Sequence, residues 1–220
     1  MHWASGGDTF TVTSGGHNKE RIFPAMPKRA FIIHGYQSYP QEAWLPWLQD
    51  QLEARGYVVS LPAMPHPDHP IIRDWIDFIA HLVGEPDKMT FMIGHSIGAQ
   101  AVLRYLETLA GRGQSVAKTV LVAGIFPTGM SLAEAERETE GNSVLVPWFS
   151  QGIDPARVKS AAGQCTVILS DNDPYIDTEK ANTVFRATLD PRIIVEPGKG
   201  HFNEDDHLAE LPSALAAVIS

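Results

Sequence analysis

The chain has 220 residues, 44% of them hydrophobic, which is enough for one domain with a substantial buried core. Its formal net charge of -9 argues against a surface built to bind nucleic-acid phosphates or an anionic membrane, so we expect neither partner. Cys165 is the only cysteine, which excludes an intramolecular disulfide and a zinc site built on two thiolates.

Residues 1–28 are rich in Gly, Ser and Thr and precede the first apolar run. We expect them to form an N-terminal extension ahead of a single domain over residues 29–220. Residues 9–13 alternate polar and apolar side chains, which leaves both a short edge strand and an irregular lead-in open. The N-terminus lacks the basic and apolar regions of a signal peptide, and no segment reaches the roughly 20 apolar residues that cross a bilayer. We therefore expect a cytoplasmic protein.

From residue 29 onward, short apolar runs alternate with helix-like segments. Most runs lack polar alternation, which is typical of strands covered on both faces. This order predicts an α/β fold with an open, mainly parallel sheet of about six strands and helices on both faces. The expected strands cover residues 30–34, 57–61, 89–93, 119–123, 166–169 and 193–195. The expected helices cover residues 42–55, 71–83, 97–110, 178–188 and 205–218.

Residues 125–152 interrupt the alternation. They contain Pro127 and Gly129, then an acidic helical patch over residues 134–140, then an apolar run over residues 144–149. We expect this segment to form a small cap over one end of the sheet. Trp148 and Phe149 lie in it, and lining a pocket and ordinary packing are equally open for both.

A Gly-x-Ser-x-Gly motif, Gly94-His95-Ser96-Ile97-Gly98, joins an expected strand to an expected helix. This turn is so tight that its flanking positions tolerate little side chain, and it lifts the serine hydroxyl above the sheet edge. The bare motif is a weak signal, but its position between a buried strand and a helix strengthens it. We predict that Ser96 is a nucleophile and that His95 packs behind it.

A serine hydroxyl needs a base to take its proton and an acid to orient that base. Asp173 is the predicted acid, because it lies past the end of the strand at 166–169 and Pro174 restricts it to an extended conformation; Asp171 is the alternative. His201 is the predicted base, because it lies on a Gly-rich loop after the last expected strand. His207 is the alternative, but we expect it to lie within the terminal helix.

Attack on a carbonyl places negative charge on its oxygen, which needs two fixed N–H donors. The N–H of Ile97 is the first expected donor, because it follows the serine at the start of a helix. The loop after the first strand should supply the second donor, and we predict the N–H of Tyr36. His34 in the same loop is expected to fix the loop rather than to transfer protons.

Several motifs together resemble the α/β-hydrolase superfamily and, more narrowly, the small serine hydrolases related to retinoblastoma-binding protein nine. They are His34-Gly35-Tyr36, Trp44-Leu45-Pro46-Trp47, Leu61-Pro62-Ala63-Met64-Pro65, Gly94-His95-Ser96-Ile97-Gly98, Ser170-Asp171-Asn172-Asp173-Pro174 and Gly200-His201-Phe202. The resemblance implies an open, mainly parallel sheet, a triad of Ser96, Asp173 and His201, no metal and no organic cofactor. Residues 1–28 lie outside the match, and residues 125–152 are longer than a minimal member needs.

These features predict a serine hydrolase that cleaves a small, neutral ester through an acyl-Ser96 intermediate. A binding protein that keeps the fold and pocket is one alternative. An acyltransferase or thioesterase that uses the same three residues is another. The sequence predicts neither the substrate nor the oligomeric state.

Overall fold

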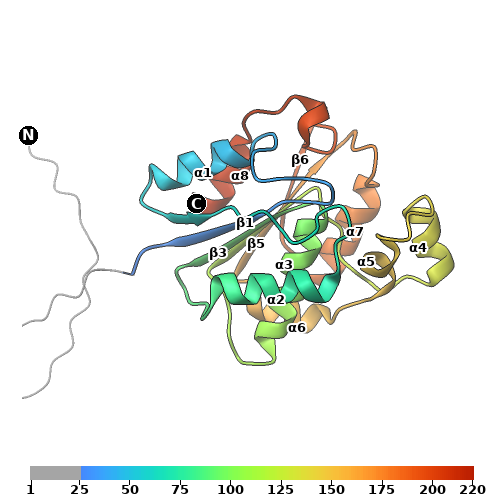
Figure 1. Cartoon of the computed structure of the whole chain (residues 1–220), viewed down its shortest axis with the longest axis horizontal. Helices are drawn as coiled ribbons and strands as arrows, with labels where there is room; N and C mark the ends of the chain where they lie inside the picture. Colours follow the sequence, from blue (N-terminus) through green and yellow to red (C-terminus); the bar gives the residue numbers. More distant parts are fainter. Residues whose placement is uncertain (1–25) are drawn as a thin grey trace, which may run out of the picture.

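A computed structural model describes residues 26–220, so the segment at 9–13 and most of the expected N-terminal extension lie outside the described residues. The described chain forms one parallel sheet of six strands in the order β2-β1-β3-β4-β5-β6 (Figure 1). The strands are β1 (Arg29–Ile33), β2 (Val58–Ser60), β3 (Thr90–His95), β4 (Lys118–Val122), β5 (Gln164–Ser170) and β6 (Arg192–Glu196). The predicted α/β class, the strand number and the parallel sheet are confirmed.

The central strands are buried on both faces, which explains their continuous apolar sequence. Alternate side chains of β1 point to opposite faces: Phe31 and Ile33 join one core cluster, while Ala30 and Ile32 join the other. A sheet with two apolar faces needs helices on both sides to cover it.

Helices cover both faces (Figure 1). On one face, α1 (Leu45–Glu53) packs against α8 (Pro212–Ile219). On the other face, α3 (Ile97–Ala110) packs against α2 (Ile72–Val83) and α6 (Pro155–Ala161), and α6 contacts α7 (Thr178–Thr188). Helix α6 was not predicted; it begins after Asp154, whose carboxylate accepts the N–H groups of Ala156 and Arg157.

The expected terminal helix at 205–218 is wrong in its extent. A single 3-10 turn, η1 (Glu204–Asp206), comes first, and α8 begins only at Pro212. Between them, His207 has a left-handed backbone with φ 54°, which ends the turn. The proline starts a new helix because the first helical position needs no N–H.

Residues 125–152 contain two short helices, α4 (Leu132–Glu138) and α5 (Val146–Ser150), which project at one end of the molecule (Figure 1). A capping box between Ser131 and Glu134 starts α4. The segment closes at its base, where the N–H of Ile153 donates to the carbonyl of Pro127 at 3.1 Å. The expected insertion therefore forms a compact unit, which we call the cap.

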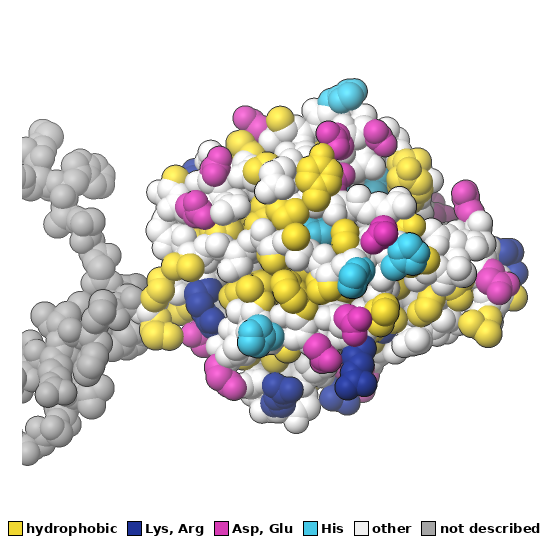
Figure 2. Space-filling model, in the orientation of Figure 1, with side chains coloured by type: hydrophobic (Ala, Val, Ile, Leu, Met, Phe, Trp, Pro, Cys, Tyr) yellow, Lys and Arg dark blue, Asp and Glu magenta, His cyan; other side chains and the backbone are white. Residues whose placement is uncertain are grey.

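The described surface agrees with the acidic composition. On the face seen in Figure 2, Lys and Arg side chains lie in small groups among acidic ones rather than in one broad patch. Within residues 26–220, no helix combines the length and the apolar character that crossing a membrane requires.

Candidate active site

Ser96 lies in the turn between β3 and α3, in a backbone conformation that L-residues rarely adopt, with φ 55° and ψ -123°. A Cβ on Gly94 would come within 2.6 Å of the Ala99 Cα, and a Cβ on Gly98 within 2.3 Å of the Ile33 carbonyl oxygen. Both glycines are therefore steric requirements of this turn. The turn presents the serine hydroxyl at the carboxyl edge of the sheet.

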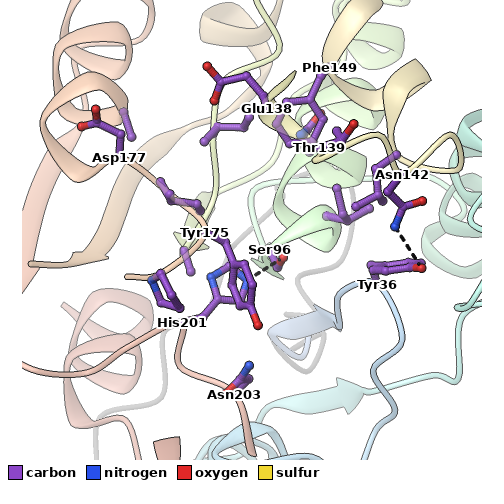
Figure 3. Close-up of a pocket in the computed structure, with 18 of the residues that line it drawn as sticks. Tyr36, Ser96, Glu138, Thr139, Asn142, Phe149, Tyr175, Asp177, His201 and Asn203 are labelled. Carbon is purple, nitrogen blue, oxygen red and sulfur yellow. Dashed lines mark hydrogen bonds between the residues drawn. The ribbon is translucent and has the colours of Figure 1, made fainter. Parts of the chain in front are cut away.

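The structure brings the three predicted side chains together. His201 Nε2 lies 2.9 Å from Ser96 Oγ, and His201 Nδ1 lies 2.9 Å from Asp173 Oδ2 (Figure 3). The Asp173 side chain is 2% exposed, and its Oδ1 also accepts the N–H groups of Tyr175 and Ile176. Because the fixed carboxylate accepts a hydrogen bond from the Nδ1–H group, Nε2 carries no proton and is left to accept the serine hydroxyl proton.

Two buried side chains hold the backbone around His201. His95 Nε2 donates to the His201 carbonyl oxygen at 2.8 Å, and Trp44 Nε1 donates to the Phe202 carbonyl oxygen at 3.0 Å. Burial lowers the pKa of His95 to about 3, so this imidazole is neutral and keeps one N–H for the bond. His201 is thus positioned from the core.

The loop after β5 also restrains the loop after β6. Asn172 Oδ1 accepts the N–H of Gly200 at 2.9 Å, and Asp171 Oδ1 accepts the N–H of Gly198 at 2.8 Å. Asp171, the alternative acid, is therefore an exposed residue whose carboxylate joins the two loops by a hydrogen bond. His207, the alternative base, is exposed at the end of η1 rather than inside a helix as expected.

The two predicted oxyanion donors belong to the residue after the serine and to the loop after β1. The loop after β1 passes so close that a Cβ on Gly35 would lie 3.0 Å from the Ser96 Cβ. Within the described chain, neither the N–H of Tyr36 nor that of Ile97 has a hydrogen-bond acceptor. Two free amide groups near the serine hydroxyl are the arrangement that a negatively charged oxygen needs.

His34 fixes the loop that carries Tyr36. Its Nε2 accepts the N–H of Met64 at 2.9 Å, and its Nδ1 donates to the Gly35 carbonyl oxygen at 3.0 Å. Burial lowers the pKa of His34, in agreement with a neutral ring that both accepts and donates. The expected structural position of this histidine agrees with these contacts.

A cavity of about 590 Å³ opens beside Ser96 and His201, between the carboxyl edge of the sheet and the cap (Figure 3). Much of its wall is apolar. The large apolar side chains of this wall include Ile97, Ile125, Phe126, Met130, Leu145, Phe149, Ile176 and Val184. Gln100 contributes a polar group to the wall, and Glu138 and Lys180 pair across part of the lining. The volume suits a small molecule with an apolar portion.

Of the two aromatic cap residues considered from the sequence, only Phe149 lines this cavity. Trp148 does not line the cavity, so of its two open alternatives ordinary packing holds. It is fully buried: its Nε1 donates to the Pro70 carbonyl oxygen at 2.8 Å, and its ring packs edge-on against Trp75. A large indole whose N–H finds a buried partner packs in the core, and here it joins the cap to the domain.

An open parallel α/β sheet with a Gly-x-Ser-x-Gly turn and hydrogen-bonded Ser, His and Asp side chains at its carboxyl edge defines the class of α/β-hydrolases. The chain belongs to the serine hydrolase family, whose pattern matches residues 30–219. The resemblance predicted from the motifs is thereby confirmed.

Two relatives match most of the chain. It is 28% identical to the putative hydrolase YdeN of Bacillus subtilis, over 89% of this chain and 96% of that protein. The crystal structure of the ydeN gene product superimposes with a TM-score of 0.74, over 86% of this chain and 95% of the other. The chain is 24% identical to the rat serine hydrolase RBBP9, over 83% of this chain and 91% of that protein.

Similarity of fold extends to esterases. A carboxylesterase structure from Nitrososphaera gargenis superimposes with a TM-score of 0.61 at 13% identity, over 80% of this chain and 84% of that chain. At this identity the match shows the shared fold alone.

Proposed function

We propose that this protein hydrolyses a small carboxylic ester through an acyl-Ser96 intermediate. The observation that carries the proposal is the unbroken line of hydrogen bonds from Ser96 through His201 to Asp173, with bond lengths of 2.9 Å, beside a cavity. Nucleophile, base and orienting acid are the parts that acyl transfer from an ester needs.

In the first half-reaction, Ser96 Oγ attacks the ester carbonyl carbon while His201 Nε2 takes its proton. The carbonyl oxygen becomes negative and accepts hydrogen bonds from the N–H groups of Tyr36 and Ile97. The tetrahedral intermediate collapses as His201 returns the proton to the leaving alcohol oxygen. The products of this step are the free alcohol and acyl-Ser96.

In the second half-reaction, His201 takes a proton from water, which attacks the acyl carbon. The same two N–H groups stabilise the oxygen, and Ser96 leaves with the proton from His201. Asp173 keeps its negative charge throughout, orients the ring and stabilises its protonated form. The reaction therefore requires no metal or organic cofactor.

The cavity supports a neutral acyl substrate of modest size. Its apolar wall suits an acyl chain, whereas the carboxylates of Glu140, Asp177 and Glu204 in its lining, which are unpaired within the described residues, disfavour an anionic one. The carboxylesterase from N. gargenis with the same fold is in line with ester chemistry. We keep the cytoplasmic location and the lack of nucleic-acid and membrane partners as predictions.

A fluorophosphonate probe with a fluorescent tag tests the nucleophile. We expect the wild-type protein to label and to cleave p-nitrophenyl acetate, and Ser96→Ala to lose labelling and at least about 10⁴-fold in kcat/KM. Ser160→Ala, which changes an exposed serine on α6, is the matched control and should label as the wild type does. A folded wild-type protein that neither labels nor cleaves the ester would favour the binding-protein alternative.

A further inference from the structure

Asn142, in the cap, has both ends of its side-chain amide engaged. Its Oδ1 accepts the N–H of Val144 at 3.1 Å, so the Nδ2 group is the end that faces the Tyr36 hydroxyl, 3.2 Å away (Figure 3). Because an amide nitrogen donates and does not accept, the Tyr36 oxygen is the acceptor of this bond. The hydroxyl proton of Tyr36 is therefore left to donate to another group.

The structure offers that proton no partner from the protein. Within residues 26–220, the Tyr36 O–H has no hydrogen-bond acceptor. Tyr36 and Asn142 both line the cavity beside Ser96, and the hydrogen bond between them is only partly buried. The mechanism above uses the backbone N–H of Tyr36 but not its side chain. The hydroxyl is thus a free donor whose oxygen is held in place by the cap.

The position of Tyr36 relative to His201 indicates which part of an ester the hydroxyl would contact. His201 returns a proton to the leaving alcohol, so the alcohol part of the substrate lies on the His201 side of Ser96. In Figure 3, the side chains of Tyr36 and Asn142 lie on the opposite side of Ser96 from His201. The acyl part of the substrate is therefore the part that extends toward them.

The charges in the lining limit which acceptor suits this donor. A carboxylate on the acyl chain would accept the proton, but the carboxylates of Glu140 and Asp177 in the same lining oppose a second negative charge. A hydroxyl oxygen also accepts, but its own proton needs a further acceptor. An uncharged carbonyl oxygen only accepts, so it meets the requirement with one hydrogen bond.

We infer that Tyr36 is a specificity-determining residue that selects oxoacyl esters, in which the acyl chain carries a second, uncharged carbonyl oxygen that accepts the Tyr36 proton. The inference rests on the proposed function, since it assigns the acyl part of the ester to the cap side of Ser96. A methylidene group (=CH2) has nearly the shape of the carbonyl group but accepts no hydrogen bond, so it leaves the donor unpaired.

Three pairs of p-nitrophenyl esters test the inference. The oxo esters are the 4-oxopentanoate, the 5-oxohexanoate and the 6-oxoheptanoate, and each is compared with the ester in which a methylidene group replaces the remote carbonyl. The series moves the acceptor outward by one carbon at a time. We expect wild-type kcat/KM to favour the oxo ester by about 2- to 10-fold in at least one pair. In Tyr36→Phe, which removes the hydroxyl and keeps the backbone N–H, this ratio should fall to about one.

Asn142→Asp tests the same proton without a change in Tyr36. One oxygen of the aspartate can still accept the Val144 N–H, and the other takes the Tyr36 proton, which is then no longer free. The ratio should again fall to about one. If Tyr36→Phe does not fold, this variant decides the question by itself.

Two matched controls should keep the wild-type ratio. Tyr57→Phe removes a tyrosine hydroxyl outside the cavity lining, and Asn182→Asp adds a negative charge on α7, also outside the lining. A wild-type ratio of one or below in all three pairs, or a ratio that both test variants leave unchanged, would overturn the role of Tyr36 while ester hydrolysis stands. Failure of the wild type to cleave these esters and p-nitrophenyl acetate would overturn both proposals.

Discussion

The loop that carries His201 and the cap lie on different sides of the same cavity, and they are held in different ways (Figure 3). The His201 loop is fixed from the core, by hydrogen bonds from His95 and Trp44 to consecutive carbonyl groups. Both donors are buried, so water does not compete for these bonds. The geometry around Ser96 is thereby fixed by the fold itself.

The cap is held by a mixture of buried and more exposed contacts. Trp148 Nε1 donates to the Pro70 carbonyl oxygen in the core, whereas other polar contacts of the cap lie nearer the surface. Arg104 on α3 donates to the carbonyl groups of Trp148 and Gln151 at 2.8 and 2.6 Å, at the end of α5. Asn142 donates to the hydroxyl of Tyr36 at 3.2 Å. The ion pair between Glu138 and Lys180 joins the cap to α7 at half-exposed positions, where such pairs contribute little.

This difference separates two functions of one site. The parts that would perform chemistry are preorganised by buried contacts, whereas the parts that would select the acyl group include two short helices that are held partly by contacts near the surface. Substitutions on the His201 side should therefore change the rate for every substrate. Substitutions in the cap or its anchors should change selectivity more than rate.

The largest expected effect is on the His201 side. His201→Ala should lower kcat for p-nitrophenyl acetate by about 10³-fold or more, because neither half-reaction then has a base. His207→Ala should change kcat less than about twofold, since that side chain is exposed and outside the cavity. Steady-state kinetics with the acetate ester measure both. The opposite ranking would show that the base has been assigned to the wrong histidine.

The fold was readable from the sequence because its signals are local and strong. Six apolar runs, each of strand length, alternate with helical segments, and both glycines of the motif around Ser96 are steric requirements of one turn. The terminal helix was misplaced because periodicity ignored Pro212, which starts α8, and the left-handed backbone at His207. A proline within an expected helix is a signal that could have been used.

The residues of the site fall into two groups. Ser96, Asp173 and His201 follow strand ends, so their meeting at one sheet edge could be predicted from the order of elements. The hydrogen-bond acceptors of His95 and Trp44 could not be predicted from the sequence, because these bonds join segments more than 100 residues apart. A buried indole N–H generally needs a hydrogen-bond acceptor, but the sequence does not indicate which residue supplies it.

The second prediction concerns pH and the burial of His95. Its pKa falls from an ordinary value of 6.5 to about 3 on folding, so between these values the unfolded state binds more protons. The free energy of unfolding should therefore decrease as the pH is lowered below 6.5. Protonation of this one group in the unfolded state should lower it by about 2 kcal/mol between pH 7 and pH 5. In His95→Gln this contribution should disappear. Urea unfolding at a series of pH values measures it.

His81→Gln, on the exposed side of α2, is the matched control for the loss of a histidine. It should keep the wild-type dependence of unfolding free energy on pH. If His95→Gln shows the same dependence as the wild type, then His95 is not the neutral donor that holds His201. That result would weaken the contrast between a His201 loop fixed from the core and a cap held partly near the surface.

The smallest expected effect tests the cap directly. Burial lowers the pKa of Arg104 to about 10, so the side chain stays charged at neutral pH. Arg104→Lys keeps the charge, but the lysine side chain is one bond shorter than the reach to Nη2, the single nitrogen that donates to both carbonyl groups. Losing one such bond, at about 1 kcal/mol, should raise KM for p-nitrophenyl hexanoate about fivefold. KM and kcat for the acetate ester should change less than about twofold, since an acetyl group is too short to reach under the cap.

Arg112→Lys, at an exposed position just after α3, is the matched control and should leave both esters unaffected. The comparison between the two esters is decisive, because Arg104 lies on α3, which begins directly after Ser96, and its substitution could also displace the serine. A fall in kcat for acetate as large as the effect on hexanoate would mean that the substitution displaces the serine. The cap and the His201 side would then respond as one unit, and the division between chemistry and selectivity would not hold.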